Sequence, residues 1–319
     1  MYALKLDHAR RQARRQARQG RPLRRRLSLV AWIALLPMAA TVVFAYLGTM
    51  LWTARVSMSY SRSLPTNTFA GVTQYVRLFE NDRWIVSLQN LAIYGVCFIA
   101  ACLAIGLLLA IFIDQRVAAE GALRTIFLYP YAMSFVATGL VWQWILNPEL
   151  GVQAVLRRIG FAHAHFDWIV TQRFAIYTLV IATVWQASGL VMALMLAGLR
   201  GIDEEIWMAA RLDGIPRWRV YASIVVPMLK TSMSTAFVLL FVMVVKLYDA
   251  VVAMTQGGPG TASEVPAKFI MDYLFNRANI GLASAASIVL LATVLAILAP
   301  VLYARNRVAA MAARRGVRT

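Results

Sequence analysis

Several polar and aromatic side chains lie in stretches of the sequence that are otherwise apolar. Lys246 and Asp249 are three residues apart, and Tyr248 lies between them. On a helix this spacing would place both charges on one face, where they could pair with each other. A charge within an apolar segment is costly and indicates a function or a partner. The other candidates of this kind are Trp185, Gln186, Ser188, Ser284 and Ser287.

These side chains supply hydrogen-bond donors, hydrogen-bond acceptors and aromatic faces, which together can bind a hydroxyl-rich solute. Two of the assignments have a simpler alternative. Lys246 and Asp249 could form an ion pair that stabilises packing against a partner subunit, and Trp185 could serve packing alone.

The sequence shows no arrangement that predicts catalysis or metal binding. A phosphate-binding loop needs a glycine-rich turn before a Lys-Ser/Thr pair, and the one such pair, Lys230 and Thr231, has none. His163 and His165 have no further ligands near them in the sequence, so we predict that they bind no metal. We expect a protein that is not an enzyme and holds no cofactor of its own.

The elements that carry these residues are expected to be membrane helices. The chain has 319 residues, of which 61% are hydrophobic and 14% charged, whereas a soluble domain has about 25% charged residues. A spanning helix needs about 20 mostly apolar residues. We therefore predict an all-α polytopic membrane protein with six transmembrane helices. The six segments that qualify are 29–52, 88–113, 122–146, 174–199, 229–252 and 280–304.

The distribution of positive charge predicts the orientation in the membrane. The net charge is +18, and ten of the 32 Lys and Arg residues precede residue 27. Nucleic acid would be one partner for such a charge, but a basic arm directly before an apolar run is typical of a cytoplasmic flank, so we expect no nucleic acid. With the N-terminus inside, the inner segments hold 22 Lys and Arg and the outer loops nine. Both termini are predicted to be cytoplasmic, with an uncleaved first helix rather than a signal peptide.

The segment 203–227, called here the 203–227 hairpin, is too regular for a simple linker. Asp203 can cap a short helix, Gly214 suits the left-handed position that ends it, and Pro216 suits the first turn of a second helix. The spacing predicts a helix–turn–helix at the cytoplasmic surface. From this spacing alone, an amphipathic hairpin lying on the membrane and a docking site for another protein are equally good interpretations.

The residues of this hairpin resemble the "EAA" loop in permease subunits of binding-protein-dependent ABC importers. That pattern is Glu-Ala-Ala, three residues, Gly, nine residues, Ile, one residue, Leu-Pro. The chain departs from it at Met208, where the family has Glu, and at Val226, where it has Leu. The matching positions are Ala209, Ala210, Gly214, Ile224 and Pro227, with Asp213 before the glycine.

The resemblance extends over nearly the whole chain. Residues 185–189, 196–199 and 255–259 look like the maltose-type carbohydrate permeases, and 79–84 and 128–130 look most like the glucose/mannose type. It implies the type I ABC importer fold, a bacterial inner-membrane location, and sugar contacts at Lys246 to Ala250. The spans and the distribution of Lys and Arg divide the chain into a basic cytoplasmic arm at 1–28, a transmembrane permease domain at 29–304 and a basic cytoplasmic tail at 305–319.

The partners that the resemblance implies are a second homologous permease, a dimer of ATP-binding subunits that holds ATP and Mg, and an extracytoplasmic sugar-binding protein. The alternative is a secondary carrier that works without an ATPase. Such a carrier would need inverted repeats and intramembrane acids for ion coupling, for which Asp249 is the one candidate. A membrane-bound enzyme would need a catalytic set that the sequence does not show.

Overall fold

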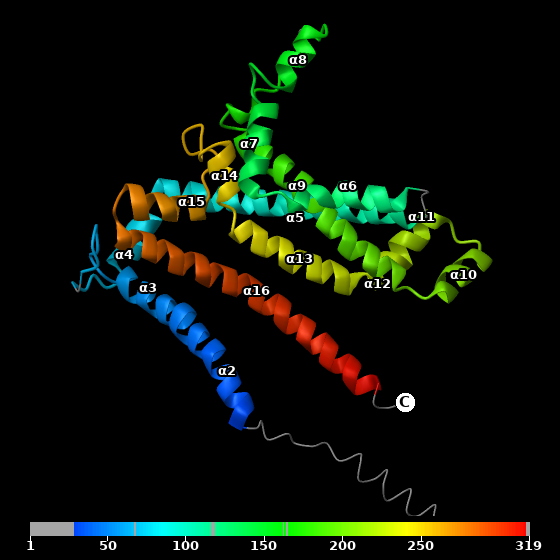
Figure 1. Cartoon of the computed structure of the whole chain (residues 1–319), viewed down its shortest axis with the longest axis horizontal. Helices are drawn as coiled ribbons and strands as arrows, with labels where there is room; N and C mark the ends of the chain where they lie inside the picture. Colours follow the sequence, from blue (N-terminus) through cyan, green and yellow to red (C-terminus); the bar gives the residue numbers. More distant parts are fainter. Residues whose placement is uncertain (1–28, 67, 116–118, 162, 164, 317–319) are drawn as a thin grey trace, which may run out of the picture. The chain divides into compact units, whose positions relative to one another are not determined.

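The computed structural model describes residues 29–66, 68–115, 119–161, 163 and 165–316, so the predicted basic arm lies outside the described residues. In this part of the chain the regular elements are all helices, apart from an isolated bridge between Ser59 and Phe69 (Figure 1). The elements are α2 (Leu29–Thr41), η1 (Val42–Gly48), α3 (Thr49–Ser57), α4 (Thr73–Phe79), α5 (Asp82–Asp114), α6 (Glu120–Ala132), α7 (Phe135–Ile145), α8 (Val152–Arg158), η2 (Asp167–Ile169), α9 (Ala175–Arg200), α10 (Glu204–Leu212), α11 (Arg217–Val220), η3 (Tyr221–Val225), α12 (Val226–Met228), α13 (Lys230–Val245), α14 (Asp249–Met254), α15 (Pro266–Met271), η4 (Asp272–Asn276) and α16 (Ile280–Gly316).

The number of candidate membrane spans agrees with the prediction. Among the described residues, four helices are long and apolar enough to cross a membrane, and two bent helix pairs raise the number to six if each pair is one span. The chain divides into two compact units, Met1–Trp52 and Thr53–Thr319. The four single spans are Ile33–Ser57, Asp82–Asp114, Ala175–Arg200 and Ile280–Pro300. The last belongs to α16, which continues as a helix past the predicted end of the span.

The third predicted span is two helices rather than one. α6 and α7 meet at an angle of 99°. Pro130 lies in the last turn of α6, and the Ser134 hydroxyl accepts a hydrogen bond from the Ala137 N–H at 3.1 Å, which caps α7. The Gln186 amide donates to the Met133 carbonyl at 2.7 Å. The break is therefore stabilised because groups outside the two helices satisfy its free backbone atoms.

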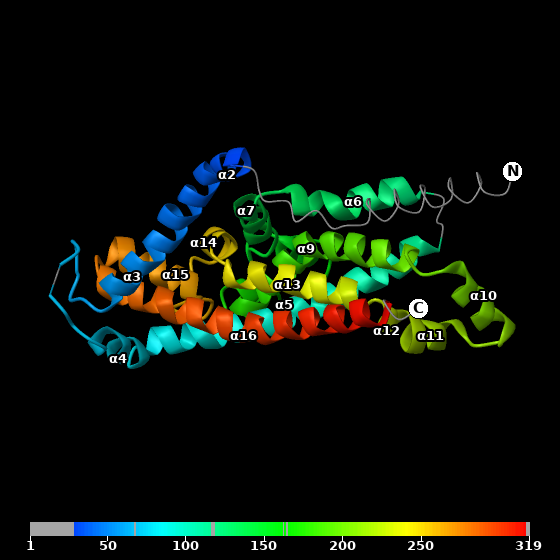
Figure 2. The ribbon, with the colours of Figure 1, turned by 90° about the horizontal axis from the view of Figure 1, so that it is seen from below.

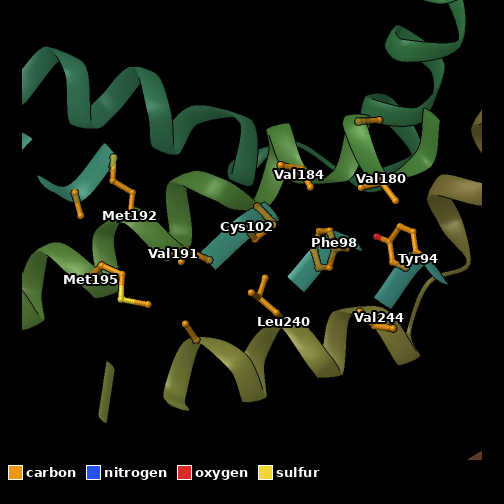
Figure 3. Packing of buried hydrophobic residues seen from close by; sticks show 14 of the residues in the cluster. Tyr94, Phe98, Cys102, Val180, Val184, Val191, Met192, Met195, Leu240 and Val244 are labelled. Carbon is orange, nitrogen blue, oxygen red and sulfur yellow. The ribbon is translucent and has the colours of Figure 1, made fainter. Parts of the chain in front are cut away.

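The core of the second unit lies where α5, α9 and α13 run side by side (Figure 2). α5 contributes Tyr94, Phe98 and Cys102, and α13 contributes Leu240 and Val244 (Figure 3). The Tyr94 hydroxyl donates to Thr183 at 2.9 Å, so its polar atom is satisfied within this apolar core. Both cysteines are free thiols. From α9 the labelled side chains are Val180, Val184, Val191, Met192 and Met195.

A second, smaller core forms between α4, the start of α5, α15, η4 and the start of α16. Trp84, Phe269 and Tyr273 are its large buried side chains. The Phe269 ring lies 5.3 Å from Trp84 and 4.3 Å from Tyr273 between centroids. The loop 255–265 connects α14 to α15, the helix that brings Phe269 into this core.

Candidate functional site

The structure confirms the helix–turn–helix predicted at 203–227. α10 begins after Asp203, which occupies the cap position but makes no capping bond with its side chain. Gly214 has a φ of +64°, the left-handed conformation that glycine adopts without strain. The Ile215 N–H donates to the Ala210 carbonyl at 3.1 Å, which closes the end of α10. Pro216 caps α11, one residue earlier than predicted.

The packed face of α10 differs from the expected one. The three- and four-residue spacing of Ile206, Ala209 and Ala210 predicts that these side chains share one packed face of the first helix. In the structure Ala210 is buried and Ile206 is half-buried, but Ala209 is exposed. Trp207 takes its place against the bundle, where its ring meets Tyr221 edge to face at 5.6 Å. The prediction is wrong at Ala209 because the large indole ring, not the small methyl group, turns toward the core.

Of the remaining predicted hairpin residues, one packs on the core and three are exposed to the outside. Ile224 is half-buried and packs on the main core. Met208, Asp213 and Pro227 are exposed. Beyond Pro227 the chain bends by 68° into α13. The hairpin is thus fixed to the bundle from one side and presents its other side outward.

A cleft of about 1290 Å³ lies between the hairpin and the adjoining ends of α5, α6 and α9. Arg200, the last residue of α9, lies 2.7 Å from Glu120 and 3.8 Å from Asp114. These pairs join three helix ends directly beside the hairpin. Sequence reasoning counted Arg200 only as a positive charge. The signal it missed was an acid at the end of α5 and another at the start of α6, both facing the same helix end.

Three of the polar candidates lie on α9, which packs against α6, α7 and α14. Trp185 is 40% exposed and meets Trp142 of α7 edge to face at 5.9 Å. Gln186 is buried, holds the α6–α7 break through Met133, and leaves its own side-chain oxygen without a partner. The Ser188 hydroxyl donates to the Trp185 carbonyl at 3.4 Å.

Lys246, Tyr248 and Asp249 do not share a helix. α13 ends at Val245 and α14 begins at Asp249, so the predicted fifth span is broken at this point. The expected common helical face for Lys246 and Asp249 is therefore wrong, and in the described structure no ion pair joins them. The Leu247 side chain is buried in the main core, whereas Lys246 and Asp249 are exposed.

The two serine candidates belong elsewhere. Ser284 is buried and Ser287 half-buried on α16, which packs against α4 and α15. The Ser287 hydroxyl donates to the Ala283 carbonyl of its own helix at 2.9 Å. The candidates on α9 and α14 thus lie on helices that pack against α7, whereas these two serines lie on α16, at the second core.

Sequence reasoning also missed a charge network that holds the loop 255–265. Arg83, in the first turn of α5, donates two hydrogen bonds to the carboxylate of the buried Glu264. It also lies 3.0 Å from Asp272. Burial opposes ionisation of Asp272, but hydrogen bonds from Asn276, Arg83 and Arg277 outweigh it and hold the pKa of this carboxyl below its ordinary value.

The His163 and His165 pair shows no metal-binding geometry. His165 lies 2.9 Å from Arg157 and 3.9 Å from Asp167. Among the described residues, no group of three or more His, Cys, Asp or Glu side chains could hold a metal ion.

Comparison with known proteins assigns this architecture to a family. Residues 102–308 match the model of the binding-protein-dependent transport system inner membrane component. The chain is 35% identical to a probable ABC transporter permease protein of Pyrococcus horikoshii, over 82% of this chain and 90% of that protein. It is 30% identical to the xylose/arabinose import permease of Haloferax volcanii, over 75% of each.

A solved structure shows the same fold. It is the bacterial alginate ABC transporter in complex with its alginate pentasaccharide-bound periplasmic protein, matched with a TM-score of 0.76 at 18% identity over 88% of this chain and 94% of the other. The helical architecture, the hairpin geometry and the family match agree. The chain is a multi-pass membrane protein that belongs to the inner membrane components of binding-protein-dependent transport systems, the permease subunits of ABC transporters.

Proposed function

We propose that this chain forms, with a second homologous permease, the membrane pathway of an ATP-driven sugar importer. The sugar is glucose, mannose or a related mono- or oligosaccharide, delivered by an extracytoplasmic binding protein. A dimer of ATP-binding subunits holds ATP and Mg and docks on the 203–227 hairpin. The observation that carries this proposal is the hairpin itself, held at Gly214 and packed on the bundle through Ala210 in a chain of this family.

Sugar as the substrate is supported from two directions. The motifs at 79–84 and 255–259 resemble carbohydrate permeases, and a relative is named for xylose and arabinose. Lys246, Asp249 and the Trp185 ring are exposed in this isolated chain. Exposed charges beside membrane helices are costly in lipid, which favours their facing the pathway or the second permease.

The orientation is part of the proposal. Both termini and the 203–227 hairpin lie in the cytoplasm, as the excess of Lys and Arg in the corresponding segments indicates. The outer loops, including α8, then face the binding protein.

Substitution of Gly214 tests the docking role. Proline requires a φ near −65° instead of +64°. It also removes the Gly214 N–H, which donates a hydrogen bond to the Arg211 backbone carbonyl at 3.2 Å. In proteoliposomes with all subunits, we expect Gly214→Pro to abolish ATP-dependent uptake while the protein still inserts. Gly214→Asn is the matched control, because asparagine tolerates the left-handed conformation, and it should retain most activity. Wild-type uptake by Gly214→Pro would refute the docking role.

The substrate and the alternative carrier mechanism need separate tests. Affinity of the binding protein for a panel of sugars identifies the substrate. Uptake by this chain in proteoliposomes without any ATP-binding subunit would favour the secondary carrier instead. In that case, uptake should depend on a proton or sodium gradient, and Asp249→Asn should remove this dependence.

A further inference from the structure

The short helix α4 is apolar on the side that faces away from the rest of the protein. Its inner side carries the buried residues Gln74 and Leu78, and the helix packs against α16. On the other side Val72 is 70% exposed, Val76 51% and Phe79 53%. Their spacing of four and three residues places these three side chains on one helical face. A helix on a water-exposed surface carries polar residues on its outer side, so this face of α4 is expected to contact something other than water.

An ordered turn before α4 adds an exposed ring to the same region. The Ala70 N–H donates to the Met58 carbonyl at 2.7 Å, beside the bridge between Ser59 and Phe69. Phe69 is exposed, and its ring edge lies 3.8 Å from the place that a side-chain carbon at Gly71 would occupy. The ring therefore lies next to the turn that leads into α4, and the apolar surface extends beyond the helix itself.

The place of α4 in the chain puts this surface at the boundary of the membrane. The candidate spans Ile33–Ser57 and Asp82–Asp114 flank the helix, and the three residues from Phe79 to Asp82 reach about 10 Å at most. The 33 residues of α5 extend about 50 Å at the usual helical rise, against roughly 40–45 Å for a bilayer with its headgroups. The ends of α5 therefore lie at the level of the headgroups. Figures 1 and 2 show α4 at the end of the bundle opposite α10.

The charges around α4 favour phospholipid over a protein as the partner. The segment 53–83 carries four arginines and two acids. The Arg77 guanidinium lies 5.7 Å from the centroid of the Tyr60 ring. An arginine and a tyrosine beside an apolar face are the residue types found at the membrane interface, where the ring lies among the headgroups and the cation meets phosphate. A binding protein that attaches and leaves would instead contact a surface about as polar as the rest of the protein.

We propose that α4 is an interfacial helix whose outer side contacts phospholipid. Val72, Val76 and Phe79 lie at the boundary between the acyl chains and the headgroups. Arg77, on the flank of this face, lies at the level of the phosphates. Because the inner side of α4 packs against α16, the helix attaches this end of the bundle to the membrane surface. Only the assignment to the outer leaflet depends on the orientation proposed above.

Spin labels on single introduced cysteines test the contact, in the permease pair reconstituted into vesicles of phosphatidylethanolamine and phosphatidylglycerol. Oxygen concentrates among the acyl chains and a water-soluble nickel complex is excluded from them, so the ratio of their collision rates with the label reports depth. We expect this ratio at Val76→Cys and Phe79→Cys to exceed that at Arg77→Cys about threefold or more, because the apolar face of an interfacial helix enters the acyl boundary. Arg77→Cys is the matched control, since Arg77 is exposed on the flank of the same helix. Labelled wild type reports the background from Cys97 and Cys102.

Three results would overturn the inference. A ratio at Val76→Cys as low as that at Arg77→Cys would show that the face contacts water. Immobile labels shielded from both reagents would show that the second permease or another protein covers it. Shielding that begins only when a sugar-loaded binding protein is added would show a docking surface for that protein. The measurement needs neither ATP nor an ATP-binding subunit, so each of these results would leave the proposed function standing.

Discussion

At the scale of single residues, a close approach between two helices is made at a glycine. Gly189 of α9 lies against the backbone of α6, where a side-chain carbon at this position would collide with the carbonyl of Phe127. Gly189 is buried and belongs to the segment 185–189. The sequence showed this motif but not why a glycine stands in it. The glycine is required because a backbone, which cannot move aside, occupies the space.

Replacement of this glycine should therefore loosen α6. We expect Gly189→Ala to destabilise the protein by about 1–3 kcal/mol, the usual cost of overpacking, measured as a lower Tm in detergent. Gly121→Ala is the matched control, because that helical glycine has open space around its α-carbon and alanine favours the helix. An unchanged Tm in Gly189→Ala would contradict the close approach.

A single carboxyl predicts a pH dependence of stability. The folded pKa of Asp272 lies below the ordinary value of 3.8, so its contribution is complete above 3.8 and is lost as the pH falls toward the folded pKa. We expect the Tm of wild type to fall more between pH 7 and pH 3 than the Tm of Asp272→Asn, measured by scanning fluorimetry. Equal losses in the two proteins would show that Asp272 does not contribute.

At the scale of elements, the loop 255–265 is attached to the start of α5 by charge. Glu264 is only 3% exposed at its side chain and accepts two hydrogen bonds from Arg83. The Asn90 amide adds a bond to the Glu264 carbonyl at 2.9 Å. The loop follows α14, the helix that begins at the candidate residue Asp249.

Removal of Arg83 should be much more costly than removal of a neighbouring arginine. Arg83→Ala would leave the buried Glu264 without its partner, which we expect to cost about 3 kcal/mol. Arg277→Ala should cost less than about 1 kcal/mol, because Arg277 is 50% exposed and Asp272 would keep Arg83. Thermal unfolding of the two variants compares these costs. Equal decreases in Tm would show that Arg83 does not hold the buried Glu264 in the way proposed.

Two breaks in the helical layout, between α6 and α7 and between α13 and α14, were only partly accessible from sequence. Pro130 and Ser134 are local signals for an end and a start of a helix. The segment 241–250 contains neither glycine nor proline, yet the helix ends at Val245. Leu247, just after the break, is buried in the main core, and such burial depends on neighbours that are distant in sequence.

At the scale of the whole molecule, the proposed topology predicts which residues each side of the membrane can reach. Leu150 and Leu212 are both highly exposed. In intact cells, a membrane-impermeant maleimide should label Leu150→Cys but not Leu212→Cys. After permeabilisation both should react, while wild type, whose two cysteines lie in α5, reports the background. Labelling of Leu212→Cys but not of Leu150→Cys in intact cells would show that the protein has the opposite orientation.

The sequence by itself determined the features that depend on local pattern. Apolar runs predicted the spans, Gly214 with its flanking helix signals predicted the hairpin, and the resemblance of the hairpin residues to the "EAA" loop indicated the family. The contacts that position the sites were decided only by the tertiary structure. The Arg83–Glu264 bond joins residues 181 positions apart, and Trp207, rather than Ala209, turns toward the bundle. The reason is physical: a helix forms from neighbours in sequence, but which face it buries and which charge it meets depend on how separate helices pack.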